Sequence, residues 1–367
     1  MSDLRQLLHS AGPEPLNEFD PDDLRVRVAR RRRTRRLVTS VTVVVVAALG
    51  LGVGVVLDRR SHDTGLDVIN QPTPTLDGQG TLPGRVRDVS VGGGGLWVVG
   101  ELDAPSWYAA QLDPSSGSVL RTVPLARVVR RVVVGRDVVW VFGGGDGGEP
   151  DGGVVAIDAQ TGDIIRSYGY AEGFSPYDLA VMDDDSVWVS DARGDRVLHL
   201  VTDVDGADAE VPVAGQPTDI VIARDGRIWV KQSLLGTVSG VDPVANEVVA
   251  TNAWTGGLLA ASVDGAVWTT DGDRLVQLAP DLLATGASAA LGVRIEIKAT
   301  AVAVDDSGLW VGGPEGVARF TTADLAGDPH PSATLAGDDV VGLAGDSSGV
   351  WFTTPDGEIH RWTPGQS

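Results

Sequence analysis

Aromatic side chains that could stack against a ligand gather in short segments between apolar runs, and segment 167–178, SYGYAEGFSPYD, holds most of them. Tyrosine and tryptophan combine a flat apolar surface with a hydrogen-bonding group, which suits binding of sugars, planar ligands or a protein partner. The alternative is that these side chains cap the ends of sheets and cover a central channel. The candidate ligand-binding aromatics are Trp107, Tyr108, Tyr168, Tyr170, Phe174, Tyr177 and Trp254.

Three charged residues follow apolar segments and could pair with a polar ligand: Asp191, Arg193 and Lys231. Their positions, directly after predicted strands, place them on the same side of the fold as the aromatic segments. Ordinary surface charges would have the same positions. We include them as candidate binding residues beside the aromatics.

Acidic runs that could bind a cation occur in a glycine-rich loop, Gly143–Gly153, and in two turns, Asp183–Asp185 and Val204–Glu210. Their spacing does not match a helical calcium-binding loop, and Asp is common in turns. The glycine-rich loop also lacks the G-K-[ST] ending of a phosphate-binding loop. We therefore expect no metal and no cofactor, with calcium or magnesium as the alternative.

Groups typical of catalysis are few. The chain has no cysteine, which excludes disulfides, a thiol nucleophile and a cysteine zinc site. Of the five histidines, His199, His330 and His360 lie in the C-terminal part, and none has a partner at metal-ligand spacing. No nucleophile–His–acid order or nucleotide-binding motif stands out, so we predict no catalytic residue.

A short motif recurs through residues 85–367: a turn is followed by an aliphatic residue, a tryptophan and a second aliphatic residue. The spacings between successive tryptophans are 43, 48, 41, 39, 42 and 41 residues. A repeat of about 40 residues with four short strands is the size of one blade of a β-propeller. The repeated tryptophans are Trp97, Trp140, Trp188, Trp229, Trp268, Trp310 and Trp351.

Four strands can be assigned within each repeat. In the fourth, DIVIA (219–223), RIWV (227–230), TVSGV (237–241) and EVVAT (247–251) are separated by turn residues such as Asp242-Pro243. A large flat tryptophan on the second strand would fill the space against the next sheet. The sequence thus predicts an all-β, seven-bladed propeller with tryptophans in its core.

The seventh repeat ends near Trp362, without a fourth strand. Segment 80–84, GTLPG, resembles fourth-strand endings elsewhere in the chain, such as TVPL at 122–125. We predict that this segment completes the last blade and closes the ring, which removes an exposed sheet edge.

Residues 37–57 form an uncharged apolar stretch that is long enough to cross a bilayer as a helix, about 31 Å. Eight arginines lie between Arg25 and Arg36, which places the N-terminus in the cytoplasm by the positive-inside rule. A cleaved signal peptide is the alternative, although the apolar stretch is too long for one. The arginines could instead contact anionic lipid or nucleic acid.

These observations predict a basic cytoplasmic tail (1–36), a transmembrane α-helix (37–57), a linker (58–79) and a propeller (80–367) on the outer side of the cell membrane. Residues 58–367 hold 44 acidic and 20 basic side chains. So acidic a region repels phosphate backbones, and we expect it to bind no nucleic acid.

The repeats resemble those of streptogramin lyase and NHL propellers. SPYDLAVMDDDSVWVSD (175–191) and QPTDIVIARDGRIWV (216–230) carry the resemblance best. Streptogramin lyases use His and Glu with magnesium on one face of the ring. The resemblance implies the propeller fold, but the W-F-T-E phrase of those enzymes reads Trp351-Phe352-Thr353-Thr354 here, with threonine in place of the acid.

Taken together, the sequence indicates a membrane-anchored, non-catalytic propeller that binds or senses a cell-envelope ligand or protein partner. One alternative is a metal-assisted lyase or lactone hydrolase of the streptogramin lyase type. The other is a structural scaffold that only assembles partners.

Overall fold

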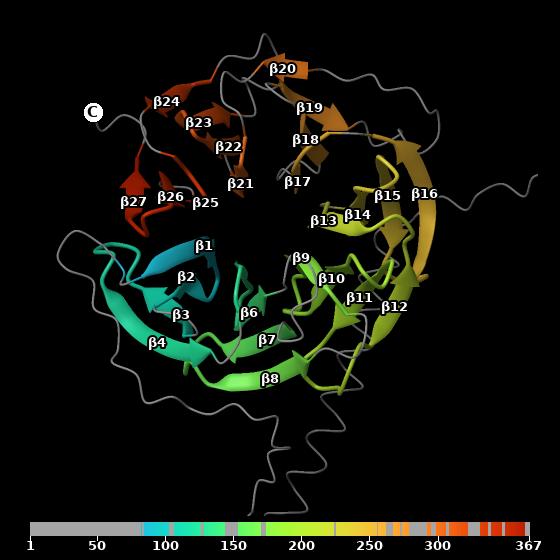
Figure 1. The fold of residues 1–367 in the computed structure, drawn as a ribbon, viewed down its shortest axis with the longest axis horizontal. Helices are drawn as coiled ribbons and strands as arrows, with labels where there is room; N and C mark the ends of the chain where they lie inside the picture. Colours follow the sequence, from blue (N-terminus) through green and yellow to red (C-terminus); the bar gives the residue numbers. More distant parts are fainter. Residues whose placement is uncertain are drawn as a thin grey trace, which may run out of the picture. The chain divides into compact units, whose positions relative to one another are not determined.

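Seven antiparallel sheets surround a central axis in the computed structural model (Figure 1). The structure describes residues 82, 84–102, 106–125, 128–143, 153–169, 174–223, 225–254, 256–261, 267–271, 274–278, 292–294, 299–305, 308–321, 331–336, 339–346 and 349–363. Within these residues no helix is long and apolar enough to cross a membrane. The predicted tail, transmembrane helix and linker lie outside them, as do most of the predicted closing segment and the 143–153 loop apart from its ends.

Each sheet is one predicted repeat, and its strands follow one another in chain order from the axis outward. The first three sheets contain β1 (Arg85–Gly92), β2 (Gly95–Glu101), β3 (Trp107–Leu112) and β4 (Val119–Leu125); β5 (Arg131–Val134), β6 (Val138–Gly143), β7 (Gly153–Asp158) and β8 (Ile164–Gly169); β9 (Pro176–Val181), β10 (Val187–Asp191), β11 (Arg196–Leu200) and β12 (Ala209–Pro212).

The remaining four sheets have the same order, except that the last has three described strands. They contain β13 (Pro217–Ile222), β14 (Ile228–Gln232), β15 (Thr237–Asp242) and β16 (Glu247–Ala253); β17 (Leu259–Ala261), β18 (Val267–Asp271), β19 (Arg274–Leu278) and β20 (Gly292–Arg294); β21 (Ala301–Asp305), β22 (Gly308–Gly313), β23 (Gly316–Thr321) and β24 (Ala333–Ala336); β25 (Gly342–Asp346), β26 (Gly349–Thr353) and β27 (Ile359–Trp362). The prediction of a seven-bladed, all-β propeller is confirmed.

The seven repeated tryptophans lie on the second strand of each blade and are at most 5% exposed. The described core divides into seven clusters, and each contains one of these indoles together with residues of the next blade. Trp188, for example, packs with Ile220 and Val230 of blade four. Each indole therefore joins two sheets, because a lone sheet cannot bury both of its faces.

Ring closure places the last blade against the first. Trp351 of blade seven shares a core cluster with Val86 and Val98 of blade one, and the same cluster contains Leu82, which is 1% exposed. The buried Leu82 agrees with a closing segment beside blade seven. Residues 80, 81 and 83 lie outside the described part, so the closing strand itself stays a prediction.

Aspartates organise the turns between third and fourth strands. Asp113, Asp158 and Asp242 each accept two backbone N–H bonds through Oδ1 from residues two and three positions later, at 2.7–3.0 Å. Asp side chains satisfy turn amides in this way without a metal ion. These are the Asp-started turns expected from the sequence.

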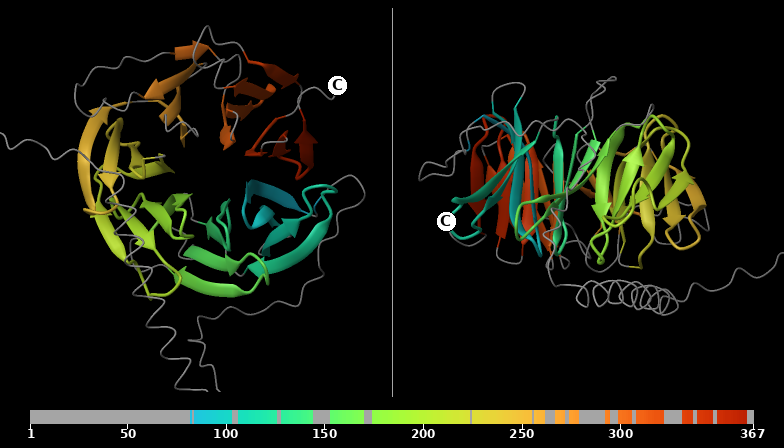
Figure 2. Two further views of the ribbon diagram at one scale, coloured as in Figure 1. Left: turned by 180° about the vertical axis from the view of Figure 1, so that it is seen from behind. Right: turned by 90° about the horizontal axis from the view of Figure 1, so that it is seen from below.

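The antiparallel order puts two kinds of connection on opposite faces of the ring (Figure 2). The crossover face carries the second-to-third-strand loops and the links from one blade to the next. The hairpin face carries the first-to-second and third-to-fourth turns. The candidate binding residues belong to loops or strand ends of the crossover face.

Candidate functional site

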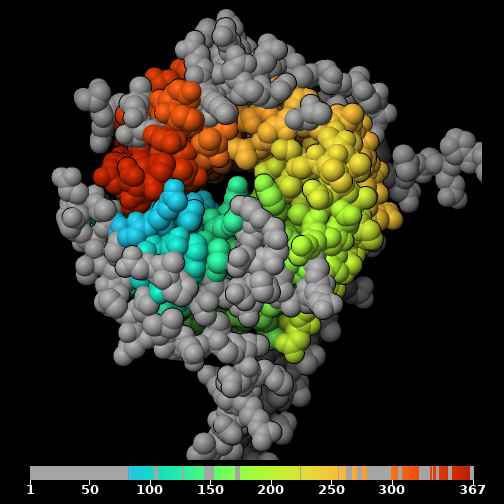
Figure 3. Space-filling model, viewed as in Figure 1, coloured from blue at the N-terminus to red at the C-terminus, as the bar shows by residue number. Residues whose placement is uncertain are grey.

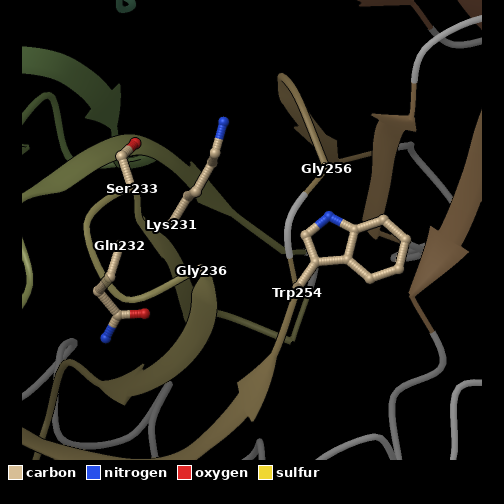
Figure 4. Close-up of a pocket in the computed structure, with 6 residues that line it drawn as sticks. All are labelled: Lys231, Gln232, Ser233, Gly236, Trp254 and Gly256. Atoms are coloured by element: carbon tan, nitrogen blue, oxygen red, sulfur yellow. The ribbon is translucent and has the colours of Figure 1, made fainter.

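A cleft of about 200 Å³ opens on the crossover face between the β14–β15 loop and the link from β16 to β17. Lys231 and Trp254, two predicted binding residues, stand on opposite sides of it, and Gly256 lies beside the indole (Figure 4). The remaining lining residues are Gln232, Ser233 and Gly236. The structure thus brings together a cation and an aromatic surface that are separated by 23 positions in the sequence.

Both side chains are held in place. The Lys231 ammonium donates to the Gly257 carbonyl oxygen at 2.8 Å and lies 3.4 Å from Oδ2 of Asp219. Trp254 Nε1 donates to Thr269 Oγ1 at 3.2 Å. Both residues remain partly exposed, so the ammonium and the indole are fixed in position yet reachable.

The loops around the cleft are tied to one another by backbone hydrogen bonds. Leu234 donates its N–H to the Gly215 carbonyl at 3.0 Å, and the Trp254 N–H donates to Gly236. Asp195 Oδ1 in turn accepts the N–H groups of Gly215 and Gln216 at 3.0 and 2.8 Å. These bonds join loops of blades three, four and five, and a surface fixed in this way loses little conformational freedom when a ligand binds.

Charged residues extend from the cleft along the innermost strands to blade one. In each blade, the tryptophan on the second strand pairs with one residue of the first strand. The residue two positions before that partner defines one equivalent position per blade: Asp88, Arg131, Asp178, Asp219, Leu258, Ala301 and Gly342. Blades one to four carry charges there, and blades five to seven do not. We call Asp88, Arg131, Asp178, Asp219 and Lys231 the charged arc.

Hydrogen bonds run from blade to blade within the charged arc. Arg131 Nη1 donates to Asp178 Oδ1 at 3.0 Å, and Asp178 Oδ2 accepts the Ile220 N–H at 3.1 Å. Asp88 Oδ2 accepts the Val132 N–H at 3.0 Å. Each of these two aspartates therefore has a partner on the following blade.

Burial dominates the electrostatics of these carboxyl groups. Desolvation raises the pKa of Asp88 and of Asp178 to about 6, although the nearby Arg131 guanidinium opposes the shift in both. The same pairing, chiefly with Asp178, raises the pKa of Arg131 above its usual range. Strongly raised carboxyl pKa values occur at functional sites and also in structural ion-pair networks.

Three of the predicted binding residues lie in blade cores. Tyr108 is 1% exposed, and its ring covers Gly100 on the adjacent strand. Tyr168 packs on Trp140 and donates its hydroxyl to the Val201 carbonyl at 2.6 Å, while Phe174 belongs to the same core cluster. Their burial leaves little surface for a ligand, so the site proposed below does not include them.

The remaining predicted residues have varied surroundings. Asp191 is fully buried; its carboxylate accepts from Arg196 Nε at 2.8 Å and from the N–H groups of Ser175 and Gly194. Trp107 is partly exposed, with Arg87 5.7 Å above its ring. Tyr177, 52% exposed, and the exposed Arg193 lie on the crossover face, and Tyr170 falls outside the described residues.

The described histidines do not fit a magnesium site. His199 stacks on Trp188 and contacts Ser186 and Asp208, while His360 stacks on Phe352. Over the part of the chain that the structure describes, no group of three His, Asp or Glu residues could hold a metal ion. His330 lies outside that part.

Sequence reasoning missed four members of the charged arc. Asp178 and Asp219 are each the only charge in an apolar first strand, which was the available signal. Asp88 follows Arg85 and Arg87 in β1, and Arg131 follows Arg130 at the start of β5, so these two gave no such signal. A single charge on such a strand has little meaning until the ring brings neighbouring repeats together.

No protein-family model and no curated protein matches this chain. Its fold is similar to a solved streptogramin B lyase (14% identity, TM-score 0.59, covering 79% of this chain and 96% of that one). It also resembles a catalytically inactive virginiamycin B lyase from Staphylococcus aureus with quinupristin (15%, TM-score 0.61, 80% and 98%). A third likeness is the β-propeller domain of Cps50 (Swd1) from Myceliophteria thermophila (12%, TM-score 0.60, 80% and 99%). These likenesses confirm the streptogramin lyase-like propeller fold.

Proposed function

We propose that this chain is a non-catalytic binding or sensor module, anchored in the cell membrane by residues 37–57, whose crossover face binds a cell-envelope ligand or protein on the outer side. The observation that carries the proposal is the cleft between Lys231 and Trp254, where a fixed cation faces a partly exposed indole. Such a combination binds one ring of a ligand by stacking and by hydrogen bonds.

The size of the cleft indicates that it holds one unit of a larger ligand, such as one ring or one side chain. Pockets for drug-sized molecules measure roughly 300 to 1,000 Å³. The observed volume of about 200 Å³ suits a single sugar ring or a single side chain of a larger partner. An extended glycan that places one ring here would continue over the neighbouring loops of the crossover face.

The proposal is tested by titrating the full-length protein, in detergent, with soluble cell-wall glycan fragments. We expect Trp254→Ala to weaken binding about fivefold, since stacking on an aromatic ring contributes roughly 1 kcal/mol. Leu120→Ala is the matched control, because Leu120 is 57% exposed on the outer strand β4, away from this face. Equal affinity of the wild type and Trp254→Ala would refute the proposal.

The alternative function is a metal-assisted lyase or lactone hydrolase, supported by the likeness in fold to the two lyase structures. Incubating the protein with quinupristin and magnesium, with and without chelator, distinguishes the two functions. Cleavage that requires the metal would favour the lyase, and unchanged quinupristin would favour the binding module.

A further inference from the structure

The outer surface of blade four is more apolar than that of the other described blades. Of the ten large hydrophobic side chains that are exposed among the described residues, five belong to this blade: Leu234, Leu235, Val244, Val248 and Val249. Leu234 is 69% exposed, the highest value of the ten. Blade four forms part of the rim of the ring, where it is coloured yellow in Figure 3. Exposed apolar side chains gathered in this way mark a contact with another molecule.

These side chains follow the outermost strand of the blade, β16, from one end to the other. Two of them lie in β16 itself, and Val244 lies in the turn before it. The two leucines lie at the far end, in the loop whose Gly236 carbonyl accepts the N–H of Trp254 at 2.6 Å. Because β16 ends its sheet, about half of its backbone N–H and C=O groups point away from β15. The apolar side chains thus surround a row of backbone groups that a further strand could bind.

The other described outer strands carry features that discourage pairing with another chain. β4 contains Arg121 and Pro124, β8 has Arg166 near its middle, and the short β12 ends at Pro212. β20 and β24 are three and four residues long. Charges, prolines and short length all keep an edge strand from pairing. β16, in contrast, has seven residues, no proline and a single charge, Glu247 at its first position.

A β-bulge at Val249 interrupts the pairing of β16 with β15. The same irregularity occurs at Leu120 in β4 and at Ile165 in β8, so the bulge does not distinguish blade four. The residue after the bulge is an arginine in those two strands, whereas it is Ala250 in β16. From Ala250 to Ala253 the strand is regular and uncharged, which leaves this stretch open to pairing.

We propose that β16 forms the interface between two copies of this chain, with the two strands antiparallel about a two-fold axis. Residues 58–367 hold 44 acidic and 20 basic side chains, so two copies repel each other over most of their surface. The uncharged part of β16 is where this repulsion is weakest. A basic partner would instead be attracted to the acidic surface elsewhere, which favours a second copy as the occupant of β16.

The two-fold arrangement also suits the ends of the strand. In an antiparallel pair the start of one β16 lies beside the end of the other, so the two Glu247 carboxylates are about 20 Å apart. At physiological salt their repulsion is largely screened over this distance. Val244 of each copy then approaches Leu234 and Leu235 of the other, as a self-complementary interface requires. The inference concerns the outer strand rather than the cleft, so it does not depend on the proposed function.

Single cysteines test the contact in the full-length protein in detergent, because the chain has no cysteine of its own. Residues 249–253 are replaced by cysteine one at a time, and each variant is oxidised. We expect a disulfide-linked dimer that forms best at the residue nearest the two-fold axis, since a disulfide needs Cα atoms roughly 4.4–6.8 Å apart. Leu120→Cys, at the equivalent bulge of blade one, is the control and should give no such dimer.

Sedimentation equilibrium of two arginine variants tests the same contact without a crosslink. Val249→Arg adds a charge to β16 and should lower the mass from that of a dimer to that of a monomer. Leu120→Arg makes the same change at the equivalent position of blade one and should leave the dimer intact. Val249 is 46% exposed and Leu120 is 57% exposed, so neither change disturbs a blade core. Glycan binding should be the same in both variants as in the wild type.

Three results would overturn the inference. The first is a monomeric wild type with no crosslink at residues 249–253. The second is a dimer that persists in Val249→Arg, because the two copies would then be joined elsewhere. The third is a monomer whose cysteines at these positions do not react with a maleimide, which would show that another segment of the same chain covers β16. None of the three affects glycan binding at the cleft, so they leave the proposed function standing.

Discussion

Blades one to four and blades five to seven share one way of packing but differ at a single position near the channel. Every blade buries one tryptophan against its neighbour. At the equivalent first-strand position, the first four blades carry Asp88, Arg131, Asp178 and Asp219, and the last three carry uncharged residues. The ring can therefore pack without these charges.

The energetic cost of burying carboxylates also indicates that packing does not need these charges. Moving a carboxylate out of water costs free energy, and its hydrogen-bond and ion-pair partners offset only part of that cost. The raised pKa values of Asp88 and Asp178 indicate that the remaining cost is substantial. Carboxyl groups with strongly raised pKa values are found at functional sites as well as in structural ion-pair networks. The tryptophans therefore mark what every blade needs for packing, and the charged arc marks what distinguishes blades one to four from blades five to seven.

The largest effect is expected from the buried tryptophans, which blades one to four and blades five to seven share. Trp188→Ala and Trp310→Ala should each lower the free energy of unfolding by about 3–5 kcal/mol, because both indoles are at most 1% exposed. Urea unfolding of the purified protein measures the two losses. A loss of unfolding free energy below about 1 kcal/mol for either variant would contradict equal packing around the ring.

A smaller effect should be confined to the charged arc. Asp178→Ala leaves the Ile220 N–H without its acceptor and Arg131 without its carboxylate, and should cost about 1–3 kcal/mol. Asp178→Asn keeps an acceptor oxygen of the same shape and should cost less. Urea unfolding of the two variants side by side would contradict the hydrogen-bond role of Asp178 if both lost the same stability.

The smallest effect is a dependence on pH. Asp88 and Asp178 have folded-state pKa values of about 6 and an ordinary value of 3.8, so the folded state binds protons more tightly. Their contribution to the free energy of unfolding is fully present below pH 4 and is lost as the pH rises through 6. The free energy of unfolding should therefore rise as the pH falls through this window. The expected gain is about 1–3 kcal/mol.

The comparison that isolates this contribution uses Asp88→Asn with Asp178→Asn. Urea unfolding at several values between pH 7 and pH 4 should show a flatter profile for the double variant than for the wild type. Other carboxyl groups, such as the turn-capping Asp158 with its lowered pKa, titrate alike in both proteins. Parallel profiles would refute the assignment of the raised pKa values to these two residues.

The repeated tryptophans made most of the fold predictable, because a blade needs the same large side chain at the same place in every repeat. The strands of the fourth repeat, for instance, match β13 to β16 to within two residues at each end. Individual side-chain directions were harder to predict. Tyr108 turns inward because Gly100, opposite it in the neighbouring strand, leaves room for its ring.

The site was only partly predictable. Trp254 was predicted from its place in a loop and Lys231 from its place directly after a second strand. Asp191 was predicted on the same grounds as Lys231, yet it is buried by the turn that it stabilises. The charged arc depends on contacts between repeats 40 or more residues apart, such as Arg131 with Asp178. No local pattern encodes such a contact, since it exists only once neighbouring blades are in place.

The joint between blade seven and blade one has a consequence for how the chain folds as it is synthesised. Val86 and Val98 emerge from the ribosome early, whereas Trp351, which covers them, comes some 250 residues later. Until then, blade one exposes an apolar surface to the solvent or to other chains. Folding in which the final contact joins distant parts of the chain is slow and prone to aggregation. Truncation before blade seven therefore leaves the first blade as the point where association with other chains begins.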